Sequence, residues 1–423
     1  MIALLAAGLL FAAEPSAAPL SLVEAIALAQ TKNPQIAIAE ADAARAHTLV
    51  KQGYALFLPT VEAQGAWQYN HERLAREFGT EELVFQPWWR RTWQVTANQS
   101  LSFHGPALPL LRQAKAGALS ASFAEDAVRA DIAFAVARAY YAALTADTVV
   151  TVAEDARTAG AELLRVATVK RQNGRATEAE VLRAKVRVAE TDQALASARR
   201  AAEETRESVA DLIGARGPFR FTRPSRPPDP SAAPSPSAGA PLRAEVSAAH
   251  AAVGVADAAN TAAFRNWYPT LGVRATYSGY DTSDGELFGQ PTQSYAVIAL
   301  AQVTLFDGTL KYWQTRETRA QLRAAKAREQ STQLAAEADE RRSRRRVVAT
   351  QESEALAKER LTLATKVREL VAGQYELGVA TQLERLDADS ASTAARREAA
   401  ATELEADLAI LELRRALGLP LLP

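Results

Sequence analysis

The stretch Thr92-Trp93-Gln94-Val95-Thr96-Ala97-Asn98-Gln99-Ser100-Leu101-Ser102-Phe103 places its side chains on two faces with a period of two. Its odd positions are mostly apolar, and its even positions are Thr, Gln, Asn and Ser. This alternation predicts a β-strand with one apolar and one polar face. Helical spacing follows over residues 106–172, and an unbroken helix of that size extends ~100 Å at ~1.5 Å per residue. A strand that leads into such a helix predicts an elongated protein.

The same plan occurs twice in the chain. Four short motifs keep their order about 200 residues apart, which a single internal duplication explains. The pairs are Leu58-Pro59-Thr60 with Tyr268-Pro269-Thr270, Leu101-Ser102-Phe103-His104-Gly105 with Leu305-Phe306-Asp307-Gly308, Gly174-Arg175-Ala176-Thr177 with Gly378-Val379-Ala380-Thr381, and Leu212-Ile213-Gly214 with Leu417-Gly418. We therefore expect a first structural repeat at 19–215, a Pro/Ser/Ala-rich extended linker at 216–241 and a second structural repeat at 242–423.

Each repeat is predicted to contain a helix, two strands and a long helical hairpin. The first helix is expected at 20–57, with Ser21 and Glu24 as a capping box. The strands are expected at 61–70, 92–103, 271–278 and 295–306, the last pattern being blurred by Ile298 and Leu300. The long helices are expected at 106–172 and 309–376, and the returning helices end near Gly214 and Gly418, where glycine can form the C-cap.

Composition excludes several classes of function. Lys and Arg equal Asp and Glu at 49 each, so bulk charge gives no reason to expect nucleic acid or an acidic substrate. The absence of Cys excludes disulfides, thiolate metal sites and a lipidated N-terminal Cys. The sequence also lacks a Gly-rich phosphate loop, a Gly-x-Ser-x-Gly elbow and a His-Glu-x-x-His pair, so we expect neither an enzyme nor a cofactor. The scattered histidines predict no metal site; they are His47, His71, His104 and His250.

Residues 1–18 have the apolar run of a signal peptide without a Lys/Arg n-region. Cleavage is expected between Ala12 and Ala18, and a mis-assigned start or an apolar helix is the alternative. No later stretch has the ~18 uninterrupted apolar residues of a spanning helix, so a membrane crossing would require strands.

The run Glu340-Arg341-Arg342-Ser343-Arg344-Arg345-Arg346 is flanked by acidic residues and indicates a solvated helix face rather than a nucleic-acid patch.

The four predicted strands have the length that a tilted strand needs to cross hydrocarbon. Four strands cannot close a barrel, because the smallest closed barrels have about eight, and open sheet edges are not tolerated in lipid. Several chains would therefore share one barrel. Aromatic residues cluster at the strand ends, as in interfacial belts; they are Trp67, Tyr69, Trp88, Trp89 and Trp93. The alternatives are a soluble sheet packed on helices and, for the helices, a cytosolic coiled-coil scaffold.

From residue 20 to residue 418 the sequence resembles the TolC-like outer-membrane factors. The resemblance rests on the opening Leu20-Ser21-Leu22-Val23-Glu24-Ala25-Ile26-Ala27-Leu28-Ala29 with Asn33-Pro34, the Leu58-Pro59 strand entry, the Leu-Phe-x-Gly strand exits, Tyr140-Tyr141 and the paired Gly-x-Ala-Thr turns. It implies an α+β membrane protein with a duplicated β-hairpin plus long α-hairpin repeat. Three copies would form a twelve-stranded transmembrane β-barrel continued by a periplasmic α-helical barrel, in the outer membrane of a Gram-negative bacterium.

The resemblance further implies the outer-membrane channel of a tripartite efflux or type I secretion system. Such a channel is a homotrimer in contact with outer-membrane lipid. It is a passive exit duct for substrates delivered by an inner-membrane pump of RND, ABC or MFS type through a periplasmic adaptor (membrane fusion protein). A soluble elongated periplasmic adaptor or scaffold is the alternative function. The sequence does not indicate the transported substrate.

The two Gly-x-Ala-Thr turns are the expected sites of adaptor docking, as the resemblance implies. Their residues are Gly174, Ala176, Thr177, Gly378, Val379, Ala380 and Thr381. A left-handed turn at Gly and a helix cap at Thr would also explain the motif without docking. Ala380 stands where the family's type member has an arginine, which puts any gate latch based on that arginine in doubt.

Glu384 and Asp387 follow the second turn at i, i+3 spacing, on one face of the predicted helix. The resemblance makes them candidates for an acidic periplasmic gate, with three copies of each around the axis. A ring of like charges attracts cations. The alternative is a solvated helix face neutralised by Arg385.

Overall fold

The computed structural model describes residues 18–79, 81–101, 105–215, 217, 219–230, 243–284 and 292–421. The predicted signal peptide and most of the predicted linker lie outside this range. Contacts divide the chain into two compact units. The first contains Met1–Glu40, Ala124–Ala244 and Gln333–Pro423, and the second contains Ala41–Phe123 and Glu245–Thr332. Each unit combines segments from both predicted repeats, whose boundaries stay a prediction.

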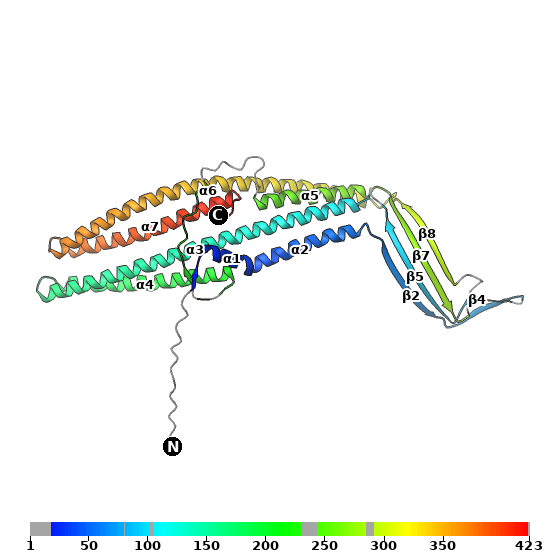
Figure 1. Cartoon of the computed structure of the whole chain (residues 1–423), viewed down its shortest axis with the longest axis horizontal. Coiled ribbons are helices and arrows are strands. Elements are labelled where there is room, and N and C mark those ends of the chain that lie inside the picture. Colours follow the sequence, from blue (N-terminus) through cyan, green and yellow to red (C-terminus); the bar gives the residue numbers. More distant parts are fainter. Residues whose placement is uncertain are drawn as a thin grey trace, which may run out of the picture. The chain divides into compact units, whose positions relative to one another are not determined.

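The second unit contains a four-stranded antiparallel sheet in the order β2-β5-β7-β8 (Figure 1). The strands are β2 (Thr60–Tyr69), β5 (Trp89–Ser100), β7 (Thr270–Thr282) and β8 (Gln293–Gln302). The register keeps apolar and polar rows apart. One row across the sheet is Ala63, Val95, Tyr277 and Tyr295, and the next is Gln64, Gln94, Ser278 and Ser294. The predicted strands and their two unlike faces are confirmed.

Several strand boundaries differ from the prediction, and β7 extends to Thr282 rather than ending at residue 278. The last strand ends at Gln302 rather than at residue 306, because its neighbour β7 begins at Thr270, opposite Gln302, and offers no partner beyond it. The strand predicted at 92–103 begins earlier, at Trp89, and its last regular residue is Ser100. Phe103 and His104 lie outside the described residues.

A short hairpin that the sequence analysis did not predict lies between β2 and β5. It consists of β3 (Leu74–Phe78) and β4 (Glu81–Gln86). Arg73 holds its base in place, because its Nη1 lies 2.8 Å from Glu82 Oε1 on β4 and its Nε lies 2.8 Å from Asp284 Oδ1 just past β7. The chain segments that follow β2 and β7 are thus joined by one guanidinium group.

Seven helices make up most of the described residues. They are α1 (Leu22–Lys32), α2 (Pro34–Ala55), α3 (Ala107–Gln172), α4 (Glu178–Ile213), α5 (Ala244–Arg265), α6 (Leu310–Glu376) and α7 (Gln382–Ala416). The two long helices α3 and α6 have 66 and 67 residues, as predicted. Within the described part of the chain, no helix combines the length and the apolar character of a membrane span.

The single helix predicted at 20–57 was wrong: it is two helices, α1 and α2. Asn33 between them has extended backbone (φ −72°, ψ 124°), because the ring of Pro34 excludes the helical conformation at the preceding residue and supplies no N–H. The Ser21–Glu24 capping box at the start of α1 is confirmed. Glu24 N–H donates to Ser21 Oγ at 3.3 Å, and Ser21 N–H donates to Glu24 Oε2 at 2.9 Å.

The core of the first unit surrounds Tyr140, which is fully buried on α3. Its hydroxyl lies 2.7 Å from Leu20 O and 2.6 Å from Thr222 O, and it accepts a hydrogen bond from Thr222 N–H at 3.0 Å. Leu20 ends β1 (Ala18–Leu20), and Thr222 follows β6 (Phe219–Phe221), and these two strands pair in parallel. One side chain on α3 therefore fixes the segments that enter α1 and leave α4.

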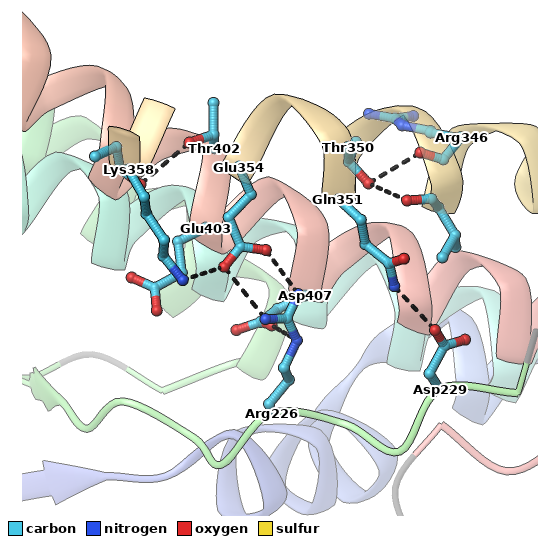
Figure 2. A network of polar contacts seen from close by, with 12 residues as sticks. Arg226, Asp229, Arg346, Thr350, Gln351, Glu354, Lys358, Thr402, Glu403 and Asp407 are labelled. Atoms are coloured by element: carbon cyan, nitrogen blue, oxygen red, sulfur yellow. Dashed lines mark hydrogen bonds and ion pairs between the residues drawn. The ribbon is translucent and has the colours of Figure 1, made fainter. Parts of the chain in front are cut away.

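We call residues 219–230 the strap; it contains β6 and then has no regular secondary structure, and its Arg226 and Asp229 are directed toward residues of α6 and α7 (Figure 2). Arg226 anchors the strap. Its Nη2 lies 2.8 Å from Glu354 Oε2 on α6, and its Nε lies 3.3 Å from Asp407 Oδ1 on α7. Lys358 Nζ also contacts Glu354, at 2.6 Å. The strap has no core of its own and is held by buried carboxylates of the helices beneath it.

The pKa values of the two carboxylates that bind Arg226 are shifted in opposite directions. Hydrogen bonding from Arg226 lowers the pKa of Glu354. Burial raises the pKa of Asp407, whose side chain is in the protein interior, and the positive charges of Arg226 and Arg223 only partly offset it. Asp407 is thus the member of the network that gives up its charge first as pH falls.

Trp93 lies across the sheet between two glycines. In register, it faces Gly65 on β2 and Gly279 on β7. A Cβ added at Gly279 would lie 2.5 Å from Trp93 Cζ2, whereas one at Gly65 would meet only Thr92 O, at 3.9 Å. The indole packs edge-on against Tyr277, with ring centroids 4.9 Å apart. The bare backbone of Gly279 is therefore required by the indole above it.

We expect Gly279→Ala to destabilise the sheet by about 1–3 kcal/mol, because the new methyl group overlaps the indole and must displace it. Gly65→Ala, in the same row on the other side of Trp93, is the control and should change stability much less. Thermal unfolding of both variants, followed by circular dichroism, measures the difference. Equal melting temperatures for the two variants would contradict the steric need for glycine at position 279.

We expect Asp407→Asn to raise the free energy of unfolding at pH 7 by about 1 kcal/mol, because burial disfavours the charged form of Asp407 while Arg226 keeps Glu354 as its partner. A carboxyl whose folded pKa is raised stabilises the fold below its unfolded pKa, about 3.9, and that stabilisation is lost as pH rises through the folded pKa. The amide removes this dependence. Denaturant titrations between pH 4 and pH 7 should show a flatter pH slope for the variant; an unchanged slope would contradict the assignment.

Candidate functional site

The two predicted turns have the same backbone geometry. Gly174 and Gly378 both adopt the left-handed conformation, with φ of 72° and 79°. Thr177 and Thr381 are the N-caps of α4 and α7, each with φ −82° and ψ 160°. The hydroxyls of these threonines accept the N–H of Glu180 and Glu384, both at 3.3 Å. The predicted left-handed glycines and threonine caps are confirmed, and docking at these turns stays a prediction.

The two turns are held together by contacts that the sequence analysis missed. Lys170 on α3 donates from Nζ to Tyr375 O on α6 at 2.7 Å, and Nζ lies 3.7 Å from the centroid of the Tyr375 ring. Gln382 on α7 donates from Nε2 to Glu180 O on α4 at 2.8 Å. We call these contacts the tip clasp. Its partners are more than 200 residues apart, so local sequence spacing gives no signal for it.

A small apolar cluster lies beside the tip clasp. Its buried members are Leu163, Ala167, Val181, Ala184 and Tyr375, and Ala380 packs against it. Burial raises the pKa of Tyr375. The ring of Tyr375 belongs to this cluster and also makes the cation–π contact with Lys170. The contact between the two helical hairpins therefore combines apolar packing with one charged side chain.

The predicted gate residues Glu384 and Asp387 are both exposed on the first turns of α7. Glu384 completes a capping box, since Thr381 N–H donates to its Oε2 at 2.7 Å, and this backbone hydrogen bond lowers its pKa. Arg385 turns toward Asp389, with Nε 3.0 Å from Oδ2, rather than toward Glu384 or Asp387. Neither predicted gate carboxylate is therefore paired with Arg385, and their role in a gate stays a prediction.

Two of the described histidines make ordinary polar contacts. His250 Nδ1 lies 2.7 Å from Glu329 Oε1, and His47 Nε2 lies 3.2 Å from Ser122 Oγ. Across residues 18–421, apart from the gaps named above, no group of three His, Asp or Glu side chains is placed to hold a metal ion. His104 falls in one of those gaps. The features that distinguish this chain are thus its sheet and its paired helical tips.

Comparison with known proteins identifies the family. The sequence profile of the outer membrane efflux proteins matches residues 25–215 and 241–419, which is most of the chain. The chain belongs to the outer membrane efflux protein family, and the predicted TolC-like resemblance is confirmed. Members of this family are efflux channels. No curated protein sequence matches the chain.

Solved structures share the fold. A membrane protein from Pseudomonas aeruginosa superposes with a TM-score of 0.81 and 18% identity, over 94% of this chain and 93% of that one. The outer membrane protein VceC from Vibrio cholerae gives 0.78 and 18%, over 94% and 96%. The open state of the Neisseria gonorrhoeae MtrE outer membrane channel gives 0.77 and 18%, over 95% and 89%. At these identities the likeness establishes the fold alone.

We expect Lys170→Met to loosen the two tips by about 1–2 kcal/mol, because it removes a hydrogen bond to a carbonyl and a cation–π contact while keeping the apolar stem. Hydrogen exchange of the amides around Thr177 and Thr381 should become faster. Lys185→Met changes an exposed lysine on α4 and should leave exchange at the tips unchanged. Equal exchange in both variants would contradict the clasp.

Proposed function

We propose that the chain is the outer-membrane channel of a tripartite efflux or type I secretion system. In this role it gives a passive exit to substrates that an inner-membrane pump of RND, ABC or MFS type delivers through a periplasmic adaptor. The observation that carries the proposal is the four-stranded sheet, whose two outer strands β2 and β8 are exposed along their whole length. Long exposed edge strands are avoided in water because they invite pairing with another chain.

Pairing of these edges with further copies would close the sheet into a membrane barrel. In lipid each unpaired N–H or C=O costs several kcal/mol, so only a closed sheet is viable. β8 of one copy pairing with β2 of the next closes twelve strands from three copies. The polar row at Gln64 and Gln94 then lines a water-filled bore. The apolar face, with Trp67, Tyr69 and Tyr295 exposed, meets lipid and its interface.

The helical hairpins of the first unit support the same assembly. Arg396 on α7 contacts Asp155 on α3 at 3.2 Å, so these two helices face one another within the chain. The flanking helices α6 and α4 carry exposed apolar residues. On α6 these repeat every seven residues and are 56–67% exposed; they are Leu356, Leu363 and Leu370. Leu182 and Val186 are exposed on α4. A heptad stripe that the described residues of its own chain leave exposed fits a helix of a second copy.

Within this assembly, three copies of Glu384 and Asp387 form the acidic gate, and the paired turns dock the adaptor. The soluble adaptor or scaffold is not favoured, because a protein dissolved in water gains nothing from two fully exposed ten-residue edge strands with an apolar face. The gate and the docking turns both lie in the first unit, and the barrel strands lie in the second.

Conductance across a planar lipid bilayer tests the channel. We expect the purified protein to conduct, and we expect cation selectivity to fall severalfold in Glu384→Gln/Asp387→Asn because the ring of charge is removed. Glutamine keeps the capping box, so the fold of α7 is preserved. Glu207→Gln, an exposed position near the end of α4, is the control for a lost charge. Absence of conductance from both the native protein and the gate variant contradicts the proposed function.

A further inference from the structure

The two turns share one backbone but present different surfaces. Gly174 N–H donates to Arg171 O at 2.9 Å, and Gly378 N–H donates to Tyr375 O at 3.2 Å. The next residue in each turn makes the same longer-range bond at 2.8 Å, from Arg175 N–H to Lys170 O and from Val379 N–H to Gln374 O. The backbone of both turns is therefore closed in the same way, whatever side chains flank the glycine.

Those flanking side chains are of opposite character. Residues 172–177, which we call the cationic turn, carry Asn173 and Arg175 around the glycine. Residues 376–381, the apolar turn, carry Leu377 and Val379, which are 82% and 76% exposed. Leu383, the second residue of α7, is also exposed. Because the backbone does not need these side chains, their difference is a difference of surface only.

The positive charge of the cationic turn is available for a partner. Arg171 is paired with Glu178, with Nη2 3.3 Å from Oε2, and Lys170 is engaged in the tip clasp. Arg175 is exposed, and within the described residues it has no hydrogen bond or ion pair through its side chain. A guanidinium in this position favours a carboxylate, to which it can donate two parallel hydrogen bonds.

The apolar turn excludes the same partner group. Glu376 precedes Leu377 and is exposed, so a second carboxylate brought to this turn meets like charge and loses its hydration against Leu377 and Val379. Neighbouring exposed apolar side chains with a polar rim are typical of a protein contact. The tip clasp holds the two turns in one unit, so a single partner assembly can reach both.

We propose that the protein docking at these tips makes two unlike contacts, an apolar one on Leu377 and Val379 and a carboxylate-bearing one on Arg175. The inference rests on the proposed function, in which the tips bind an adaptor, and adds the chemistry that each turn selects. The apolar turn disfavours the carboxylate that the cationic turn attracts, so the partner is fixed in one rotational register around the channel and cannot bind one turn out of step.

Labelled single-cysteine proteins test this selection, since the chain has no Cys of its own. One dye is placed at Gln172→Cys and, in a second protein, at Gln374→Cys, both of which are exposed at or beside their turns. The probes are two synthetic helical hairpins with identical helices, one with Leu and Val in its loop and one with two Asp. We expect the acidic hairpin to bind the cationic turn roughly tenfold more tightly than the apolar turn, and the apolar hairpin to show the reverse preference.

Salt separates the two contacts. Between about 0.1 M and about 1 M salt the Debye length falls from about 10 Å to about 3 Å, so binding of the acidic hairpin at the cationic turn should weaken severalfold while binding of the apolar hairpin should not. The exchange variants Asn173→Leu/Arg175→Val and Leu377→Asn/Val379→Arg keep both glycines and both threonine caps. In each variant the altered turn should take the preference of the other turn.

The outcomes are distinct. If both hairpins bind both turns equally, or the exchange variants keep the native preferences, the two-contact inference is overturned while docking at the tips stands. If neither hairpin binds either turn at millimolar concentration, docking at the tips itself fails. If Leu377→Asn/Val379→Arg changes the number of copies in light scattering and leaves hairpin binding unchanged, a second copy covers the apolar turn and the inference is overturned.

Discussion

Every N–H and C=O group along the free sides of β2 and β8 needs a hydrogen-bond partner, and the proposed architecture follows from that need. The chain supplies only four strands to this sheet, and their faces already differ enough for one to meet lipid and the other water. A sheet of this kind is complete only when copies of the chain join edge to edge. In the proposed architecture, the bore and the placement of the gate around an axis both follow from closing one hydrogen-bond ladder.

The first unit, which contains the helical hairpins, is held together by contacts of a different kind. Its core is fastened at Tyr140, its strap at Arg226 and its tips at Lys170. Each fastening joins segments from different parts of the chain through a single side chain.

Local pattern predicted most of the elements. The period of two located β2, β5, β7 and β8, and the duplicated Gly-x-Ala-Thr motif located both turns, because these signals lie within a few residues of one another. The break at Pro34 was visible in the sequence, but the apolar periodicity on either side of it favoured one helix. The β3–β4 hairpin has no clear alternation. Lys170–Tyr375 and Arg226–Asp407 join residues that only the folded chain brings together, so no spacing rule could have predicted them.

The mass of the assembly is the most direct test of a barrel shared by several copies. Native mass spectrometry of the protein released from lipid nanodiscs counts copies without relying on transport. We expect three copies, in which β8 of each pairs with β2 of the next. A single copy that keeps its full sheet content in the lipid disc would contradict the proposed barrel, because its two edge strands would then lie unpaired in hydrocarbon.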